Sequence, residues 1–463
     1  MAAAGRLRRF AIRVLDHRHP VAAPLARNSV TRNIVYKTLG TVVEKALKLL
    51  IVPLIARTLG ARVYGQYSYA VTVAALAVQM TDLGLGLFMA REIARHDAPP
   101  AKLIGQILTL KGVLAVGYLL VMAGLTWWHL ADPTAGKGAV PRPHAGALAF
   151  TIALVGLAGL ATSAVEAIWQ VFRGVQRLEL EARSSSLFAG IQLIAVFSAV
   201  TLSANLWPNG SDLSLTMVAI GCSMAVAGIA GAAHALWLMK KVVTPEYGWS
   251  RDAMGRFVGE VLPLGVAIVA SLVYFKIDVL MLRALRGDEE TGWYSAAYKQ
   301  LEYASIVPAI LMAATFPALS QTVVNDPARA WKLHKRTLLA LVGVGCIGAL
   351  ILAGAPALVI HLLYGDGFEP SVDMLRVLAP SVILTLVNYL ETHMLVALGL
   401  VGEQMAFTLV LVVVNVGTNW FLVPRYGGIG AGIATAVTEL VLLGFCGPLV
   451  WREMHRRMRA GAA

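Results

Sequence analysis

The residues best suited to chemistry in this sequence are charged side chains that lie inside long apolar stretches. The basic ones are Lys45, Lys48, Lys111, Lys276, Lys299 and Arg376, and the acidic ones are Glu44, Asp82, Glu166, Asp278, Glu302, Glu391 and Glu439. A charge at the bilayer centre costs at least about 2.5 to 3.5 kcal/mol, so each is a candidate functional residue. Cations in a water-filled cavity can hold a phosphate, and a carboxyl in low dielectric can take up a proton or a sodium ion.

Spacing leaves two interpretations open for the charges of the first and eighth apolar stretches. Glu44 and Lys48 are four residues apart, which is the favourable order for an ion pair on one helix face. Lys299 and Glu302 are three residues apart and could neutralise each other in the same way. Lys45 lies about 100° around the helix from Glu44 and has no such partner on its own helix. Lys45 or Lys48 is the preferred anion contact, with self-neutralisation of Glu44 and Lys48 as the alternative.

Lys276 and Asp278 lie roughly 160° apart on one helix, so a straight helix can direct only one of them into a cavity. Asp278 is the preferred cavity residue, and Lys276 then pairs with a neighbouring helix or reaches the interface. For Lys111 and Arg376, the sequence also allows two roles, contact with the substrate or a structural role such as reaching the membrane interface.

Six carboxylates are candidates for coupling or gating: Glu44, Asp82, Glu166, Asp278, Glu302 and Glu439. Asp82 precedes a glycine-rich helix end, where it either gates or pairs with a basic loop. Glu166 and Glu439 have no basic residue three or four positions away, so they are the preferred proton or sodium sites. An ion pair with another helix is the alternative for both. No metal site is expected.

The elements that carry these charges are predicted to be membrane-spanning helices. The chain has 463 residues, of which 58% are hydrophobic and only 14% are charged, whereas a soluble domain carries about 25% charged residues. The chain contains repeated apolar stretches of roughly twenty residues, without the strict alternation of barrel strands. In lipid, such stretches can satisfy their backbone hydrogen-bonding groups only as α-helices. The expected spans are approximately 33–56, 64–89, 103–128, 146–171, 184–205, 215–239, 257–282, 292–319, 337–363, 374–399, 405–423 and 429–451. The fold class is therefore an all-α polytopic membrane protein of about twelve transmembrane helices.

The distribution of Lys and Arg predicts the orientation, because basic short loops stay in the cytoplasm. Basic clusters such as Lys240/Lys241 and Lys335/Arg336 fall on one side, together with both chain ends, while the other side holds few. We expect both termini to be cytoplasmic. The formal charge of +13 is thus explained by basic residues that set the orientation in the membrane. Nucleic acid is not an expected partner. A cleavable signal peptide is not expected, because no apolar run precedes Ile34.

The two halves of the chain repeat each other in parallel. Residues 54–59 (LIARTL) and 65–70 (GQYSYA) correspond to residues 280–285 (LMLRAL) and 292–297 (GWYSAA), with nearly one offset in residue number. Such repeats are common in transporters, whose binding site lies between the halves. The expected domains are a basic N-terminal tail (1–32), an N-lobe (33–240), a basic linker (241–256), a C-lobe (257–452) and a basic C-terminal tail (453–463).

The order and spacing of several short segments resemble the polysaccharide-export branch of the multidrug/oligosaccharidyl-lipid/polysaccharide (MOP) exporter superfamily, which includes the Wzx-type O-antigen flippases. These segments are 53–60 (PLIARTLG), 64–67 (YGQY), 82–85 (DLGL), 91–95 (REIAR), 277–280 (IDVL), 292–294 (GWY), 363–365 (LYG), 397–399 (ALG), 415–424 and 426–431 (YGGIGA). The resemblance covers nearly the whole chain from Asn33 to Trp451. No single segment is specific to the family.

The resemblance implies a flippase of the bacterial inner membrane with a MATE-like fold of two six-helix lobes. It implies alternating access that moves undecaprenyl-diphosphate-linked oligosaccharide repeat units to the periplasmic leaflet for surface polysaccharides such as lipopolysaccharide or exopolysaccharide. The expected partners are this lipid-linked sugar, membrane lipids, and a polysaccharide polymerase with its chain-length machinery. No cofactor is expected, with H+ or Na+ coupling left open.

Two other functions are weighed. A cation-coupled small-molecule or drug exporter of the same superfamily would share the helices and the repeat, but the basic residues within the spans favour an anionic substrate. A membrane polysaccharide polymerase or acyltransferase would need a nucleophile and a base. The longest outward connection, near 129–145, offers only His129, Asp132 and His144. The sequence therefore favours a transporter over an enzyme.

Overall fold

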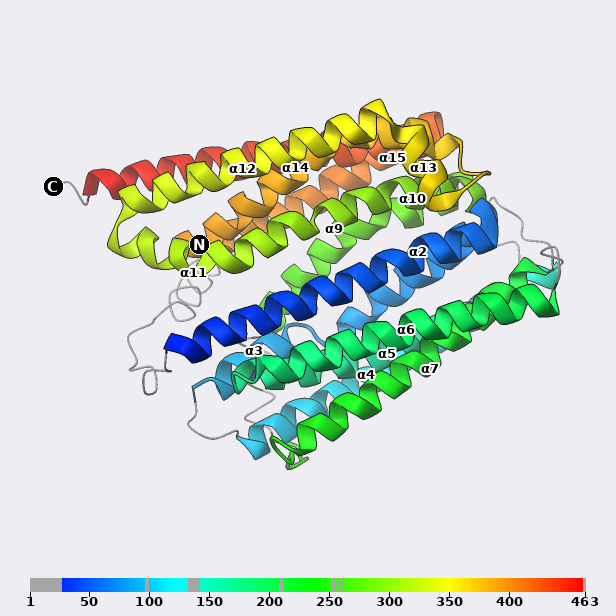
Figure 1. Ribbon diagram of the computed structural model, residues 1–463, viewed down its shortest axis with the longest axis horizontal. Helices are drawn as coiled ribbons and strands as arrows, with labels where there is room; N and C mark the ends of the chain where they lie inside the picture. Colours follow the sequence, from blue (N-terminus) through cyan, green and yellow to red (C-terminus); the bar gives the residue numbers. More distant parts are fainter. Residues whose placement is uncertain are drawn as a thin grey trace. The chain divides into compact units, whose positions relative to one another are not determined.

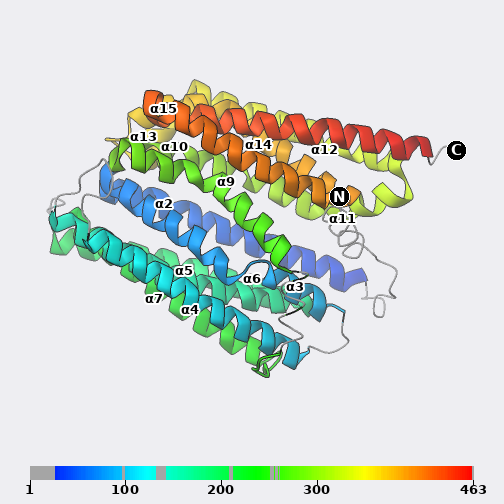
Figure 2. The ribbon, with the colours of Figure 1, turned by 180° about the vertical axis from the view of Figure 1, so that it is seen from behind.

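The computed structural model describes residues 27–95, 100–131, 142–207, 212–250, 255, 259 and 261–460, with side chains omitted at some of these positions. Within these ranges the regular secondary structure is helical throughout (Figures 1 and 2). Most of the predicted N-terminal tail lies outside the described residues, as does part of the predicted linker at 251–254 and 256–258. The predicted all-α fold class is confirmed.

The first compact unit of the fold covers the chain up to Gly292. Its elements are α2 (Arg27–Val78), η1 (Gln79–Thr81), α3 (Leu85–Ile93), α4 (Ala101–Ala131), α5 (Arg142–Gly174), α6 (Leu178–Leu206), α7 (Leu213–Lys240) and α9 (Leu262–Arg286). Helix α5 packs against α2, α3, α4, α6 and α7, so it is the central helix of this unit. Side chains on α5 are therefore placed to meet residues from almost every neighbour.

The second compact unit begins at Trp293. Its elements are the greater part of α10 (Asp288–Ala304), then α11 (Ile306–Asn325), α12 (Pro327–Gly354), α13 (Pro356–Tyr364), α14 (Pro370–Leu398) and α15 (Val401–Ala460). Helix α14 packs against α11, α12, α13 and α15 and is central here. Helices α5 and α14 hold the fourth and tenth predicted spans, which correspond in the internal repeat.

Local sequence explains where several helices begin. The Asp212 carboxylate accepts a hydrogen bond from the backbone N–H of Leu215 at 3.0 Å, and Asp326 accepts one from Arg329 at 2.9 Å. These caps satisfy backbone donors that have no partner within their own helix. Proline occupies the first turn of α12, α13 and α14, where its missing N–H removes no helical hydrogen bond.

Glycines with positive φ interrupt the chain at equivalent places in the two repeats. Gly60 has φ 67° within α2, and Gly287 has φ 95° directly after α9. Side chains with a Cβ rarely adopt this backbone region. The two glycines are separated along the chain by the same offset as the segments that begin at Gly65 and Gly292. The chain therefore turns at matching positions after the first and seventh predicted spans.

Seven of the described helices are long and apolar enough to cross a membrane, and one bent pair, Asp288–Met312 with Thr315–Asn325, would make eight. Helix α2 is interrupted at Gly60 and helix α15 at Gly427. Each of these two helices therefore includes residues of two predicted spans. The described residues of the predicted spans are largely helical, but spans 64–89, 292–319 and 337–363 each contain a break between two helices. The chain is a polytopic membrane protein, while the number twelve and the lobe boundary at 241–256 stay predictions.

The apolar core of the first unit holds the short helix α3 in place. Leu85, Met89 and Ile93 of α3 are almost fully buried and belong to one cluster with Phe172 of α5 and Phe188 of α6. The cluster also includes residues of α4 and α7. Close packing of this kind fixes the start of α3 and the bend that precedes it.

Candidate functional site

The chain bends sharply at Asp82, between η1 and α3. Leu83, directly after Asp82, has φ 42°, and Gly84 has φ 85°. A leucine at positive φ is uncommon and strained, and such strain persists only where surrounding contacts enforce it. One contact is a hydrogen bond of 3.3 Å from the backbone N–H of Gly86 to Oδ1 of Asp82. The bend therefore aims a carboxylate into the bundle at a point where the helix is interrupted.

Lys111 of α4 forms an ion pair with Asp82. The Lys111 side chain is buried, with 8% of its surface exposed, while that of Asp82 is 30% exposed. The sequence singled out both residues without pairing them, and the structure brings them together. A buried ion pair is weak evidence for stability, because desolvation offsets most of the attraction. Its presence within a membrane segment is better explained by function.

A polar stripe on α5 faces this bend. Ser163, Glu166, Gln170 and Arg173 follow one another at helical spacing and share one face. The hydroxyl oxygens of Ser163 and Thr81 lie 2.7 Å apart, so the stripe is hydrogen-bonded to η1. Sequence reasoning selected only Glu166. The polar residues of the stripe are spaced by three, four and three residues. This helical spacing is the signal that would have revealed Ser163, Gln170 and Arg173.

Charged groups from three helices surround Glu166. The residues that interact with it electrostatically are Lys48 of α2, Asp82, Lys111 of α4 and Arg173 of α5. The Glu166 side chain is nevertheless exposed, so it borders open space and is not packed in the core. We call Glu44, Lys48, Asp82, Lys111, Glu166 and Arg173 the charge cluster.

The charge cluster has three basic and three acidic members, and Glu181 is a further carboxylate next to it. Lys48 Nζ lies 2.7 Å from Glu44 Oε1, which is the self-neutralising pair that the spacing allowed. Arg173 donates to Oε1 of Glu181 through Nε at 3.0 Å and through Nη2 at 2.6 Å. Each cation of the cluster thus already has a carboxylate partner. An incoming anion has to compete with that partner, which makes the site suited to partner exchange.

The remaining candidates of the first unit lie in different surroundings. Lys45 is exposed, and Lys276 is half-buried. Asp278 is 2% exposed, and its Oδ1 lies 2.9 Å from the backbone N–H of Val279. Of the two candidates on α9, Lys276 and Asp278, Asp278 is therefore the more deeply buried. The substrate or coupling roles of these three residues stay predictions.

The basic candidates of the second unit are paired on their own helices. Lys299 Nζ lies 2.6 Å from Glu302 Oε2, as the three-residue spacing allowed. Arg376 Nη1 lies 2.8 Å from Asp373 Oδ1, and both side chains are more than half exposed. The cationic substrate-binding role assigned to these residues remains a prediction.

Two buried carboxylates of the second unit lie on α14 and α15. Oε2 of Glu439 accepts a hydrogen bond of 2.7 Å from the Asn388 amide. One turn further along α14, Oε1 of Glu391 lies 3.0 Å from Nε2 of His334 on α12. The His334 and Glu391 side chains are 2% and 5% exposed, and Trp331 stacks on the His334 ring with centroids 5.0 Å apart. The sequence did not select His334, because it lies among basic residues at a helix start.

Replacing His334 by Ala is expected to destabilise the protein by about 3 to 5 kcal/mol, because it leaves the buried Glu391 without its imidazole partner. The unfolding midpoint of the purified protein in detergent, measured by tryptophan fluorescence, checks this. His361→Ala, at a histidine that is 47% exposed, is the matched control and should leave the midpoint unchanged. An equal shift in both variants would mean that the His334–Glu391 contact does not stabilise the fold.

The last turn of α13 and the loop that follows it carry an exposed group of His361, Asp366 and Glu369. Oε1 of Glu369 accepts a hydrogen bond of 3.0 Å from the backbone N–H of Gly367, and this bond lowers the pKa of the Glu369 carboxyl. The possible ligand atoms of the three residues lie within 4.8 Å of one another. Exposed acidic groups commonly gather in this way without binding a metal, so we assign no site here.

Helices α2 and α10 cross with their backbones in contact. A Cβ added to Gly65 would lie 1.8 Å from the carbonyl oxygen of Asp288, and one added to Gly292 would lie 1.9 Å from that of Ala61. The two contacts are related by the repeat, because Ala61 corresponds to Asp288 and Gly65 corresponds to Gly292. We call this contact the glycine crossing. Only glycine permits so close an approach.

Side chains next to the glycine crossing hold it closed. Gln66 Nε2 donates to Asp288 Oδ2 at 2.9 Å, and Arg283 Nε donates to Asp288 Oδ1 at 2.6 Å. The guanidinium carbon of Arg283 lies 4.0 Å from the ring centroid of Tyr69. The sequence identified the repeated segments that contain these residues but assigned them no role.

Comparison with known proteins agrees with this architecture. A curated relative from Escherichia coli (strain K12), which carries the name O-antigen transporter, is 23% identical over 76% of this chain and 80% of its own. A MATE family multidrug resistance transporter of the MOP superfamily, in an inward-facing conformation, matches with a TM-score of 0.72 at 15% identity, covering 91% of this chain and 99% of that one. The lipid II flippase MurJ, in its inward closed conformation, matches with a TM-score of 0.59 at 13% identity, covering 91% and 90%.

The structural matches show the fold alone, because their sequence identities are low. The sequence profile of the polysaccharide biosynthesis protein family matches residues 30–323, which is more than half of the chain. The predicted resemblance to the MOP exporters is thereby confirmed. The chain has the MOP exporter fold and belongs to the polysaccharide biosynthesis protein family.

Proposed function

We propose that this protein is a flippase for lipid-linked precursors of surface polysaccharide, with undecaprenyl-diphosphate-linked oligosaccharides as its substrates. The family membership, the relative named for O-antigen transport and the fold shared with a lipid II flippase support this proposal. The observation that carries it is the charge cluster, which lies within membrane-spanning helices at an interrupted helix.

The charge cluster supplies what a diphosphate head group needs inside a membrane. Lys48, Lys111 and Arg173 can donate hydrogen bonds to phosphate oxygens, and such charge-assisted bonds are about twice as strong as neutral ones. Each donor must first loosen its contact with a carboxylate. Uptake of a proton or sodium ion by Asp82 would weaken its contact with Lys111, whereas uptake by Glu166 would remove a negative charge that acts on all three cations. Either change would favour substrate binding. We propose that this exchange couples an ion to transport.

The glycine crossing is the proposed gate for alternating access. It joins the second and eighth predicted spans at their starts, on the side that the distribution of basic residues predicts to be periplasmic. When the glycine crossing is closed, it separates the charge cluster from the periplasmic side. Opening the crossing requires the Gln66–Asp288 hydrogen bond to break. In this scheme the protein lies in the bacterial inner membrane with cytoplasmic termini. It passes its cargo to a polysaccharide polymerase with its chain-length machinery.

Labelling tests the proposed orientation. A cysteine placed at Lys332, in a variant without Cys222, Cys346 and Cys446, is expected to resist a membrane-impermeant thiol reagent in intact cells and to react after permeabilisation. Equal reaction in intact cells would place this loop in the periplasm and overturn the orientation.

Deleting the gene in its native bacterium is expected to cause undecaprenyl-diphosphate-linked oligosaccharides to accumulate and surface polymer to disappear. Mass spectrometry of the lipid-linked sugars checks this and gives the mass of the repeat unit. Complementation with the wild-type gene should restore both readouts. Normal lipid-linked pools together with increased sensitivity to cationic drugs would instead indicate a small-molecule exporter.

A further inference from the structure

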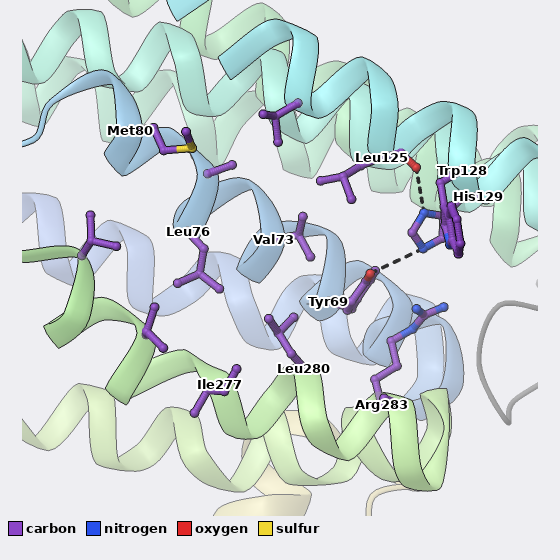
Figure 3. A pocket seen from close by; sticks show the side chains of 15 residues that line it. Tyr69, Val73, Leu76, Met80, Leu125, Trp128, His129, Ile277, Leu280 and Arg283 are labelled. Carbon is purple, nitrogen blue, oxygen red and sulfur yellow. Dashed lines mark hydrogen bonds between the residues drawn. The ribbon is translucent and has the colours of Figure 1, made fainter. Parts of the chain in front are cut away.

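An apolar groove of about 910 Å³ runs between α2, α4 and α9 (Figure 3). This volume is at the upper end of the range for small-ligand pockets, about 300 to 1,000 Å³. Most of its lining is aliphatic, with Val73 and Leu76 from α2, Leu125 from α4, and Ile277 and Leu280 from α9. A surface of this composition fits a hydrocarbon chain.

One end of the groove is polar. Arg283, Tyr69 and His129 line it there, and Figure 3 shows the Tyr69 side chain between the other two. Nδ1 of His129 lies 2.8 Å from the carbonyl oxygen of Leu125, so Nδ1 donates and Nε2 faces the Tyr69 hydroxyl at 3.5 Å. Arg283 bonds to Asp288 through Nε and also hydrogen-bonds to the Tyr69 side chain. A guanidinium has five N–H donors, so it can serve a further acceptor as well.

The other end of the groove approaches the charge cluster. Met80 lines that end and lies two residues before Asp82. From Tyr69 to Met80 the helix advances about 16 Å, at 1.5 Å per residue. This is about half of the roughly 30 Å hydrocarbon layer. The groove therefore extends from a position beside the charge cluster toward the glycine crossing.

We propose that this groove binds the isoprenoid chain of the lipid-linked substrate, with the diphosphate held by Arg283 at the polar end. This proposal rests on the proposed flippase function and adds to it a second binding site for the diphosphate head group. The charge cluster holds the head group at one end, and Arg283 receives it at the other. The chain stays in contact with aliphatic side chains throughout.

The shape of the groove favours a polyprenyl lipid over a bulk phospholipid. The groove has an aliphatic lining and one polar end, which matches one hydrocarbon chain on one phosphate group. A phospholipid carries two chains on its phosphate and would have to leave one of them outside. Exposed Trp128 borders the polar end, where an aromatic ring can stack on the sugar that follows the diphosphate.

Binding of undecaprenyl diphosphate to the purified full-length protein, followed by native mass spectrometry, tests the proposal. Val73→Trp fills the groove and is expected to weaken binding at least tenfold. Val226→Trp is the matched control, because Val226 of α7 is 64% exposed and lies outside the groove; it should bind normally. Normal binding by Val73→Trp would overturn the proposal, as would an equal loss of phosphatidylglycerol binding, which identifies the groove as a site for bulk lipid.

The role of Arg283 is tested with two ligands that share one chain. In the Lys111→Met/Asp82→Asn background, which removes one phosphate donor of the charge cluster, the protein should still bind undecaprenyl diphosphate more tightly than undecaprenol. Adding Arg283→Gln should reduce this preference at least tenfold while leaving undecaprenol binding unchanged. A preference retained in Arg283→Gln would remove Arg283 from the site. The gene deletion separates the two proposals: accumulation of lipid-linked sugars with normal binding by Val73→Trp refutes the groove alone, whereas normal sugar pools refute the flippase.

Discussion

Replacing Lys111 by Met is expected to reduce export of lipid-linked oligosaccharide at least tenfold, the largest loss of any single substitution in the charge cluster. The change removes a phosphate donor and leaves Asp82 without the lysine that neutralises it. Removing one partner of a buried pair costs about 3 to 5 kcal/mol, so the amount of folded protein should also fall. Surface polymer and protein level in the membrane, measured in a complemented deletion strain, give the two readouts.

The double variant Lys111→Met/Asp82→Asn separates transport from folding. Removing both charges restores much of the lost stability, because a buried ion pair and a neutral replacement are often similar in free energy. We expect normal membrane levels with export still reduced at least tenfold. A double variant that exports at the wild-type rate would show that the pair serves the fold and has no part in transport.

Replacing Gly65 by Ala is expected to reduce export at least tenfold, although alanine is the better helix former by about 1 kcal/mol. The added methyl group would lie 1.8 Å from the Asp288 carbonyl oxygen, so the glycine crossing is unable to close. A transporter that fails to close one gate loses alternation. The fully buried Thr291, replaced by Cys in a variant without the native cysteines, should then react faster with an impermeant thiol reagent.

Gly190→Ala is the matched control for this experiment. Gly190 lies within α6, and a Cβ there would meet no atom within 4 Å. Export should stay normal in this variant, and Thr291→Cys should remain protected from the reagent. Normal export by Gly65→Ala, with Thr291→Cys still protected, would show that the crossing is not a gate.

The fold class could be predicted from composition and hydropathy because lipid allows so few backbone structures. The described residues of the predicted spans are largely helical, and the offset of the sequence repeat recurs in the breaks at Gly60 and Gly287. Helix ends were harder to place, because the breaks in α2 and α15 are confined to Gly60 and Gly427 and the helices extend into the predicted loops at 57–63 and 424–428 from both sides. Hydropathy detects the membrane, but it does not detect whether a helix continues beyond it.

Pairing within a helix was also predictable. The contacts of Lys48 with Glu44 and of Lys299 with Glu302 follow directly from spacing. The contact of Lys111 with Asp82 joins residues 29 positions apart on different helices, and only tertiary packing brings them together. The sequence therefore identified most members of the charge cluster without showing that they meet.

The measurement that tests the central claim most directly uses purified protein reconstituted into liposomes. A fluorescent undecaprenyl-diphosphate-linked oligosaccharide from the native bacterium is placed in both leaflets, and a membrane-impermeant quencher reports its movement. The account predicts that all of the fluorescence becomes quenchable with the wild-type protein and only about half with Lys111→Met/Asp82→Asn. Quenching that stops at half with the wild-type protein, while the same liposomes transport a cationic dye, would contradict the flippase and favour a small-molecule exporter.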